Sequence, residues 1–306
     1  MHLSISLRIA TRKSPLALWQ ANAVKQALIK AHPKLKISLV PISSSGDQIL
    51  DRPLADFGGK GLFVKEVEQA LLSGQADIAV HSAKDMPPTN ADGLHIAGSL
   101  QREDPRDAWI SSQPYHFDIP SLRVGTASPR RTALLRHHTP QLQVATIRGN
   151  IATRIKRYKS GEFHATLLAM AGLKRLEHPE LIHAQPLDTN VFVPAAGQGI
   201  IAMQCRDDDT SPQVLIKTIS DKATQQCLVI ERALVHMIQG NCHSPIGAFA
   251  SLDQHHVELQ ACVLDPEGKQ KIQVKHRTSL QQQEQLAEIV FQKLCDQNAL
   301  SLLQSQ

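Results

Sequence analysis

The chain has 306 residues, about twice the length of a typical single domain, so we expect two or three domains. Hydrophobic residues make up 42% of it, but no run approaches the roughly eighteen consecutive apolar residues of a transmembrane helix. The first residues contain no apolar stretch suited to a secretory signal peptide, so we expect a cytoplasmic protein with no membrane partner.

The positive charge of the chain is concentrated in one segment. Residues 121–176 contain eleven Lys or Arg and one acidic residue, so this segment carries +10 while the remainder carries −5. Such a concentration indicates a polyanionic partner: nucleic acid, an anionic membrane, or a small polycarboxylate or polyphosphate. Tyr158 and Phe163 are the only aromatic residues in the segment. Few aromatic side chains are therefore present to stack on bases, which argues against a nucleic-acid partner.

Short apolar runs alternate with helical periodicity from residue 7 to about residue 200. This alternation is typical of α/β domains with largely parallel sheets. In chain order it predicts a strand at 8–10, a helix at 15–31, a strand at 36–41, a helix at 62–73, a strand at 76–81 and, after a loop, a strand at 122–125, a helix at 129–137, a strand at 144–147, a helix at 151–159 and a strand at 165–170.

The pattern changes near residue 221. It predicts a helix at 228–239, strands at 248–252, 257–263 and 271–276, and a helix from 280 to about 297. Strands flanked by helices without βαβ alternation indicate a small α+β domain. The chain therefore combines an α/β part with a separate C-terminal α+β part.

The α/β part repeats itself. LRIATRKSP at 7–15 resembles LRVGTASP at 122–129, and ADIAVHSAKD at 76–85 resembles HATLLAMAGLK at 164–174. Each pair has a strand followed by the same kind of turn, which predicts two α/β domains of similar plan facing each other across a cleft. The matches are short, so chance similarity is the alternative.

Two segments place a serine before a proline, at 14–15 and 128–129. Such a serine suits a helix N-cap, where unpaired N–H groups and the helix dipole form an anion site. Arg12 precedes the first helix, and Arg130 and Arg131 fall in the first turn of the second, where cations oppose the dipole. We expect an anion between these arginines and the helix terminus; a solvated basic turn is the alternative.

Three further charged residues lie beyond predicted strand ends: Arg148, Arg154 one helical turn later, and Asp85. Ligands of open α/β sheets bind at the carboxyl ends of strands, and the guanidinium fork suits carboxylate or phosphate. Among such arginines, Asp85 would accept a hydrogen bond from a ligand N–H or stabilise a developing cation. An ion pair with a neighbouring arginine is the alternative.

The five cysteines, at 205, 227, 242, 262 and 295, contain no CxxC pair. This argues against a zinc site or a redox motif, and we expect no metal. Four of them lie in apolar or helical runs and are expected to be structural. Cys242 lies instead in the loop GNCHSPIG beside a histidine, which suits either a reactive thiol or an inert loop cysteine.

Together these segments resemble the hydroxymethylbilane synthase family, also called porphobilinogen deaminases. The similarity runs across nearly the whole chain in family order. The matching segments are RIATRKSPLALWQ (8–20), GGKGLFVKEVEQALL (58–72), ADIAVHSAKDMP (76–87), REDPRDAW (102–109), VGTASPRRTALL (124–135), IRGNIATRI (147–155), AGLKRL (171–176), PAAGQG (194–199) and ERALVHMIQGNCHSPIGAFA (231–250).

The resemblance implies an α/β fold with two similar domains like those of periplasmic binding proteins, plus a small α+β C-terminal domain with a cysteine loop. It places domain 1 at 1–99 and 199–217, domain 2 at 104–194 and domain 3 at 221–306. It also implies a monomer that passes its product to uroporphyrinogen-III synthase.

The resemblance further implies a transferase of tetrapyrrole (haem) biosynthesis. Cys242 would hold one dipyrromethane cofactor through a thioether, and four porphobilinogen units would be added to it singly with loss of ammonia. Hydrolysis would then release the linear tetrapyrrole. Each pyrrole carries an acetate and a propionate, so the growing chain is a polycarboxylate that the basic segment would neutralise.

The resemblance also assigns residues. Asp85 would be catalytic, binding pyrrole N–H groups and stabilising the azafulvene cation that forms when the amine leaves. Cofactor-binding positions would be Cys242, Ser82, Lys84, Asp85, Thr126, Ser128, Arg130, Arg131, Arg148, Gly149 and Arg154. Substrate-binding positions would be Arg12, Ser14, Lys60, Phe63, Arg148, Arg154 and Gln198.

Ser45, Asp56 and Asn241 depart from the residues usual in the family. Asn tolerates positive φ, so we expect the cysteine loop to form with Asn241 in place of glycine. A non-catalytic anion-binding protein on the same scaffold is the alternative function, and it would need neither Cys242 nor Asp85. A nucleic-acid binder is a more distant alternative, which predicts affinity falling steeply with salt.

Overall fold

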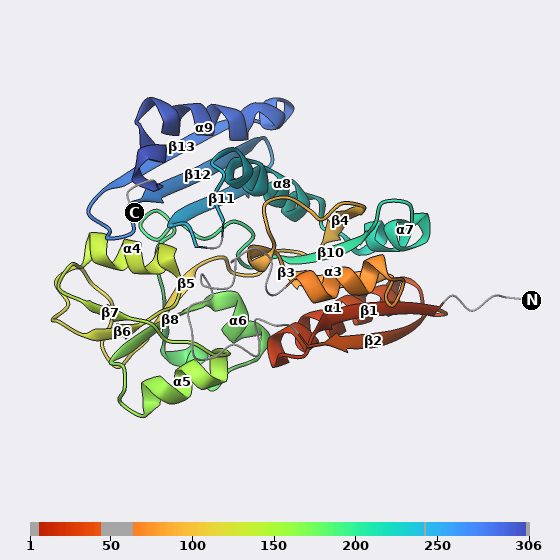
Figure 1. Cartoon of the computed structure of the whole chain (residues 1–306), viewed down its shortest axis with the longest axis horizontal. Helices are drawn as coiled ribbons and strands as arrows, with labels where there is room; N and C mark the ends of the chain where they lie inside the picture. Colours follow the sequence, from red (N-terminus) through yellow and green to blue (C-terminus); the bar gives the residue numbers. More distant parts are fainter. Residues whose placement is uncertain (1–5, 44–63, 242, 304–306) are drawn as a thin grey trace, which may run out of the picture. The chain divides into compact units, whose positions relative to one another are not determined.

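The chain is seen in a computed structural model that describes residues 6–43, 64–241 and 243–303. It divides into two compact units (Figure 1). The first contains Met1–Glu103 and Ile200–Gln226, and the second contains Asp104–Gly199 and Cys227–Gln306. No helix in the described ranges is long and apolar enough to span a membrane.

The first unit is built on a five-stranded mixed sheet. β1 runs parallel to β2 and β3, whereas β10 runs antiparallel to β3 and β4. In spatial order the strands are β2 (Lys36–Ile42), β1 (Ser6–Arg12), β3 (Ile78–Ser82), β10 (Ile201–Arg206) and β4 (Leu94–Ser99).

Among the described residues, three helices cover this sheet: α1 (Pro15–Ala31), α3 (Lys65–Leu72) and α7 (Thr210–Ile219). Ile9 of β1 packs in one cluster with side chains of α1 and α7, and the next residue, Ala10, packs in another with α3. Successive side chains of a strand point to opposite faces. Helices α1 and α7 therefore cover one face and α3 the other.

The second unit contains a sheet of the same plan. β6 runs parallel to β7 and β8, and β5 runs antiparallel to β8 and β9. Helix α4 (Pro129–His138) packs on one face, and α5 (Ile151–Lys159) and α6 (Met170–Arg175) pack on the other. The strands in spatial order are β7 (Gln143–Ala145), β6 (Arg123–Gly125), β8 (Ala165–Ala169), β5 (Asp107–Ser111) and β9 (Ala184–Pro186).

The second unit also contains an antiparallel sheet of three strands. Side chains of α8 and α9 form one core with this sheet, and Figure 1 shows α9 lying along it. The elements are α8 (Lys222–Met237), which belongs to this unit from Cys227 on, β11 (Ile246–Leu252), β12 (His256–Leu264), β13 (Lys271–Ser279) and α9 (Leu286–Asp296).

The predicted fold class is confirmed. The internal repeats correspond to equivalent strands, β1 with β6 and β3 with β8, so the prediction of paired α/β domains holds for their sheets. Helices predicted at 15–31 and 151–159 match α1 and α5 in full. The predicted boundary between domains 2 and 3 stays a prediction, because both of their sheets fall in one compact unit.

The expectation of largely parallel sheets was wrong at one side of each sheet. Strands β4, β5, β9 and β10 were not predicted, and they include β10 and β5, which run antiparallel to both of their neighbours. β5 begins within the charged run REDPRD, and such a run gives no period-two signal.

Candidate active site

In the first unit, the carboxyl ends of β1 and β3 meet because the two strands are parallel neighbours. Arg12 is the last residue of β1, and Asp85 ends the 3₁₀ turn η2 (Ala83–Asp85) that follows β3. Arg12 Nη1 lies 3.7 Å from Asp85 Oδ2, with the side chains 20% and 37% exposed. The ion pair considered from the sequence is therefore formed, but it is long and leaves the Asp85 carboxylate open to solvent.

Two serines at this edge hold local structure. Ser14 caps α1, its Oγ accepting the Ala17 N–H at 3.3 Å. Ser82, the last residue of β3, accepts a hydrogen bond from Nε2 of the buried Gln20 on α1 at 2.9 Å. Together they fix α1 against β3, and Lys84 follows within η2. The structure thus brings Arg12, Ser14, Ser82, Lys84 and Asp85 to one sheet edge.

A chain of hydrogen-bonded side chains beneath this sheet edge was not predicted. Nε2 of His81, on β3, lies 3.1 Å from Gln204 Oε1, and Gln204 Nε2 donates to Glu68 Oε1 at 2.9 Å. His81 and Gln204 are buried. This chain of side chains links β3 to β10 and α3 just before the turn that carries Asp85.

In the second unit, the equivalent edge is formed by the ends of β6 and β7. The Thr126 N–H donates to Ala145 O at 3.0 Å, which joins the two strand ends. Thr126 Oγ1 accepts the Ser128 N–H at 3.2 Å, and Ser128 Oγ accepts the Arg131 N–H at 3.4 Å as the N-cap of α4. The predicted N-cap is confirmed.

Arg148 and Arg154 flank a turn at the same edge. Gly149 has φ of +103°, and a Cβ there would lie 2.7 Å from Thr153 Cγ2, so glycine is required. Asn150 Oδ1 accepts the Thr153 N–H at 2.9 Å and caps α5. Arg154 Nε donates to Gly149 O at 2.8 Å, which holds its guanidinium against the turn.

Arg130 and Arg131 are buried, so the solvated basic turn is wrong for them. Arg131 Nη2 lies 2.7 Å from Asp107 Oδ1, and Arg130 Nη1 lies 2.9 Å from Asp107 Oδ2. Backbone carbonyls receive further bonds: Arg130 Nη1 donates to Val193 O and Arg131 Nη1 to Leu167 O. The anion expected between these arginines and the helix terminus is thus provided inside the protein by Asp107.

Asp107 is fully buried, and sequence analysis did not single it out. Its burial would raise the pKa of the carboxyl, but the charges of Arg130 and Arg131 outweigh burial and hold the pKa well below its usual range. Two guanidinium groups share one carboxylate, so the cluster keeps a net positive charge. Gln198, predicted as a substrate residue, donates to Asp107 Oδ1 at 2.9 Å and is itself buried.

Glu231 is a second buried carboxylate that the sequence analysis missed. Its oxygens accept the N–H groups of Gly197 and Ala250, each at 2.7 Å. Segment 194–199, which contains Gln198, is thereby tied to β11. The signal in the sequence was an acidic residue on an otherwise apolar face of α8.

Comparison with known protein families identifies the family of the chain that carries these sheet edges. Residues 7–214 match the family model described as "Porphobilinogen deaminase, dipyromethane cofactor binding domain", and residues 225–296 match "Porphobilinogen deaminase, C-terminal domain". The chain belongs to the porphobilinogen deaminase family. The function predicted from the motifs is therefore confirmed: the chain is a transferase of tetrapyrrole biosynthesis that uses porphobilinogen and a dipyrromethane cofactor.

Solved structures similar to this chain include solute-binding proteins. An ancestral cationic amino acid solute-binding protein is 13% identical with a TM-score of 0.43, covering 70% of this chain and 87% of its own. The probable amino-acid ABC transporter extracellular-binding protein ytmK from Bacillus subtilis is 10% identical with a TM-score of 0.43, covering 75% and 96%. At this level the similarity carries no information on ligand or activity.

Three predicted site residues, Lys60, Phe63 and Cys242, lie outside the described residues, as do Ser45 and Asp56. The ends of the cysteine loop are described. The positive φ expected at Asn241 occurs instead at Gln239, with φ of +57°. Asn241 Oδ1 accepts the His243 N–H at 2.8 Å, so its side chain stabilises the turn directly.

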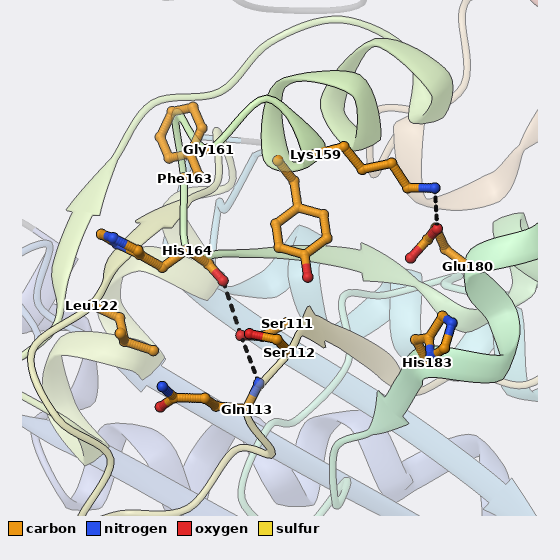
Figure 2. A pocket seen from close by; sticks show the side chains of 11 residues that line it. Ser111, Ser112, Gln113, Leu122, Lys159, Gly161, Phe163, His164, Glu180 and His183 are labelled. Carbon is orange, nitrogen blue, oxygen red and sulfur yellow. Dashed lines mark hydrogen bonds and ion pairs between the residues drawn. The ribbon is translucent and has the colours of Figure 1, made fainter.

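A cavity of about 460 Å³ in the second unit lies apart from the candidate site residues of that unit (Figure 2). It borders Leu122 and His164, where β6 and β8 begin, so it lies at the opposite edge of the sheet from Thr126. Figure 2 shows Lys159 Nζ directed at Glu180 Oε1, 2.5 Å away. None of the predicted site residues that the structure describes lines this cavity.

Proposed function

We propose that this chain adds four porphobilinogen units, one at a time and each with loss of ammonia, to a dipyrromethane held by Cys242, and then releases the linear tetrapyrrole by hydrolysis. The observation that carries the proposal is the Arg12–Asp85 pair at the ends of β1 and β3. It places an accessible carboxylate beside a guanidinium, which suits a substrate that has both acidic side chains and a pyrrole N–H.

Asp85 is the catalytic residue of this proposal. Loss of ammonia from the aminomethyl group of porphobilinogen leaves a cation spread over the methylene and the pyrrole ring. A carboxylate held next to the ring N–H accepts its hydrogen bond and stabilises that charge as it develops. The contacts of Ser82 with Gln20, and of His81 with Gln204, hold the end of β3 from which Asp85 projects.

The substrate carboxylates have a second set of partners. Arg12, Arg148 and Arg154 provide guanidinium forks suited to acetate and propionate groups. The N-caps at Ser14 and Ser128 add the positive ends of α1 and α4. Lys60, Phe63 and Gln198 complete the substrate-binding set that we propose.

The described residues suit a polycarboxylate cofactor. Nε of Arg130 is buried with no hydrogen-bond partner among the described residues, and the arginine pair keeps a net positive charge over Asp107. Dipyrromethane supplies the pyrrole carbon to which the first unit is joined. We propose that Cys242 attaches it and that its other partners are Ser82, Lys84, Asp85, Thr126, Ser128, Arg130, Arg131, Arg148, Gly149 and Arg154.

The remaining elements of the proposal concern the setting of the reaction. We propose that the chain acts as a cytoplasmic monomer and that its linear product passes to uroporphyrinogen-III synthase. Light scattering of the loaded protein tests whether the chain is a monomer, and a dimer mass would contradict this. A coupled assay with that synthase tests the second.

Intact mass of the purified protein tests the proposed reaction. We expect added mass equal to two linked pyrroles, further additions of single pyrrole units on incubation with porphobilinogen, and no adduct on Cys242→Ser. Cys295→Ser is the matched control, because Cys295 is a half-buried thiol of the same unit and should load normally. No adduct on the wild type, even with preformed hydroxymethylbilane supplied, would indicate the anion-binding alternative.

A further inference from the structure

We propose that Asp107 is a positioning residue for cofactor loading. It orients Arg130 and Arg131 at the start of α4, and through Gln198 it connects them to segment 194–199. That segment is bonded to β11, the strand after the Cys242 loop. The inference rests on the proposed function and deepens it. Asp107 is fully buried, so it acts through its neighbours.

The position of Asp107 follows from the sheet. It is the first residue of β5 and lies opposite Ala169, the last residue of β8. Because β5 runs antiparallel to β8, its beginning lies at the edge where β6 and β8 end. Asp107 therefore lies below the edge that carries Thr126 and Ser128.

The first set of hydrogen bonds to Asp107 comes from the two arginines. Arg131 directs Nε and Nη2 at Asp107 Oδ1, at 3.0 and 2.7 Å, and Arg130 Nη2 donates to the same oxygen at 3.1 Å. A carboxylate gripped by several donors fixes the orientation of both guanidinium planes. It also offsets two cations in a helix first turn, where they oppose the dipole.

A second set of hydrogen bonds connects Asp107, through segment 194–199, to the C-terminal sheet. Gln198 Nε2 donates to Asp107 Oδ1, and the neighbouring Gly197 N–H donates to the buried Glu231. Glu231 accepts the Ala250 N–H of β11 with its other oxygen. A chain of buried contacts thus runs from the arginine pair to β11, the strand that follows the Cys242 loop.

In this arrangement Asp107 holds other residues in place and does not itself contact the cofactor. Arg131 Nη2 also donates directly to Gln198 Oε1, at 3.5 Å, but the shorter hydrogen bonds of both residues, at 2.7 and 2.9 Å, are made to Asp107 Oδ1. Removing the charge at Asp107 should loosen the arginine pair relative to the segment while leaving the predicted ligand-contacting side chains present. The effect should therefore appear in the rate at which apoprotein acquires its cofactor.

Loading kinetics test the inference. Apoprotein carrying Asp107→Asn is incubated with preformed hydroxymethylbilane, and the adduct is followed by intact mass with circular dichroism recorded on the same sample. We expect loading slowed between about tenfold and a hundredfold in protein that remains folded, as when a reacting group is misplaced. Glu180→Gln is the matched control, because Glu180 is a buried carboxylate paired with Lys159 at the opposite sheet edge. It should load at the wild-type rate.

Asp107→Glu keeps the inference testable if Asp107→Asn does not fold. It retains the charge but shifts it by one methylene, so loading should be slowed less than in Asp107→Asn and more than in Glu180→Gln. Wild-type loading in a folded Asp107→Asn or Asp107→Glu protein, or a loss that only follows the unfolded fraction, would overturn the positioning role. Failure of the wild type and Glu180→Gln to load would instead remove the proposed function itself.

Discussion

In the first unit an aspartate follows the central strand β3 and lies 3.7 Å from an arginine, more than a third exposed; in the second unit an aspartate at the same kind of sheet edge is fully buried between two arginines. The strand order around the two residues is the same. The difference lies in burial, since Asp85 follows its strand in a surface turn whereas Asp107 opens the crossing strand β5.

Burial decides what each carboxylate does. An exposed ion pair contributes little to stability because water solvates both charges, and for the same reason its carboxylate is free to exchange partners. A buried carboxylate with several charge-assisted hydrogen bonds cannot exchange them without leaving a desolvated charge. The same residue types thus give one unit an acid suited to chemistry and the other a fixed electrostatic support.

The largest effect on stability is expected from Asp107→Asn. Removing one partner of a buried ion pair leaves uncompensated charge, so the free energy of unfolding should fall by about 3–5 kcal/mol. Urea denaturation of the whole chain measures it. Because the pKa of Asp107 is lowered in the folded protein, its contribution is present above the unfolded value of 3.8 and is lost as pH falls through the lower folded value. A change below about 1 kcal/mol, as for an exposed pair, would break the comparison.

Asp85→Asn should separate activity from stability. We expect turnover of porphobilinogen to fall by about 10²- to 10³-fold, the usual loss when one electrostatic stabiliser is removed. The free energy of unfolding should change by less than about 1 kcal/mol, because the Arg12–Asp85 pair is long, at 3.7 Å, and partly open to solvent. Asp92→Asn, at an exposed turn of the same unit, is the control and should leave both unchanged. Near-normal turnover would remove Asp85 from its catalytic role.

The two N-caps offer a sharper comparison of equivalent positions. Ser14→Ala and Ser128→Ala each remove the oxygen that accepts an N–H in the first turn, so each should lower the free energy of unfolding by about 1 kcal/mol. Only the second cap leads directly into the arginine pair, so Ser128→Ala should also slow cofactor loading. Thr at either position should restore stability, and equal loading in the two alanine variants would contradict a role for the α4 terminus.

The smallest effect concerns pH. Burial, Lys271 and His137 lower the pKa of His138 to about 4, and Lys271 Nζ lies 3.2 Å from its Nε2. The unfolded chain binds this proton near 6.5, so stability from neutral His138 is present above pH 6.5 and decreases as pH falls toward 4. His138→Gln should flatten that part of the unfolding profile.

Local sequence signals predicted the parts of the fold that local physics decides. Helices α1 and α5 were predicted in full because the helical periodicity of each, and the N-cap Ser14 of α1, are local features of the sequence. The repeats at 7–15 and 122–129 predicted equivalent strands for the same reason. The strands β5 and β10 were missed because the strands that they pair with in the centre of each sheet, β8 and β3, lie more than fifty residues away in the chain.

For the candidate site, the sequence by itself determined the chemical inventory: arginines and serines at strand ends, an aspartate after β3, and motifs that carry the family. It did not determine which charges meet. Asp107 reaches Arg130 across 23 residues and Gln198 across 91. Only the order of strands in the folded sheet brings these groups together, because the electrostatic interaction that pairs them depends on distance in space and on burial.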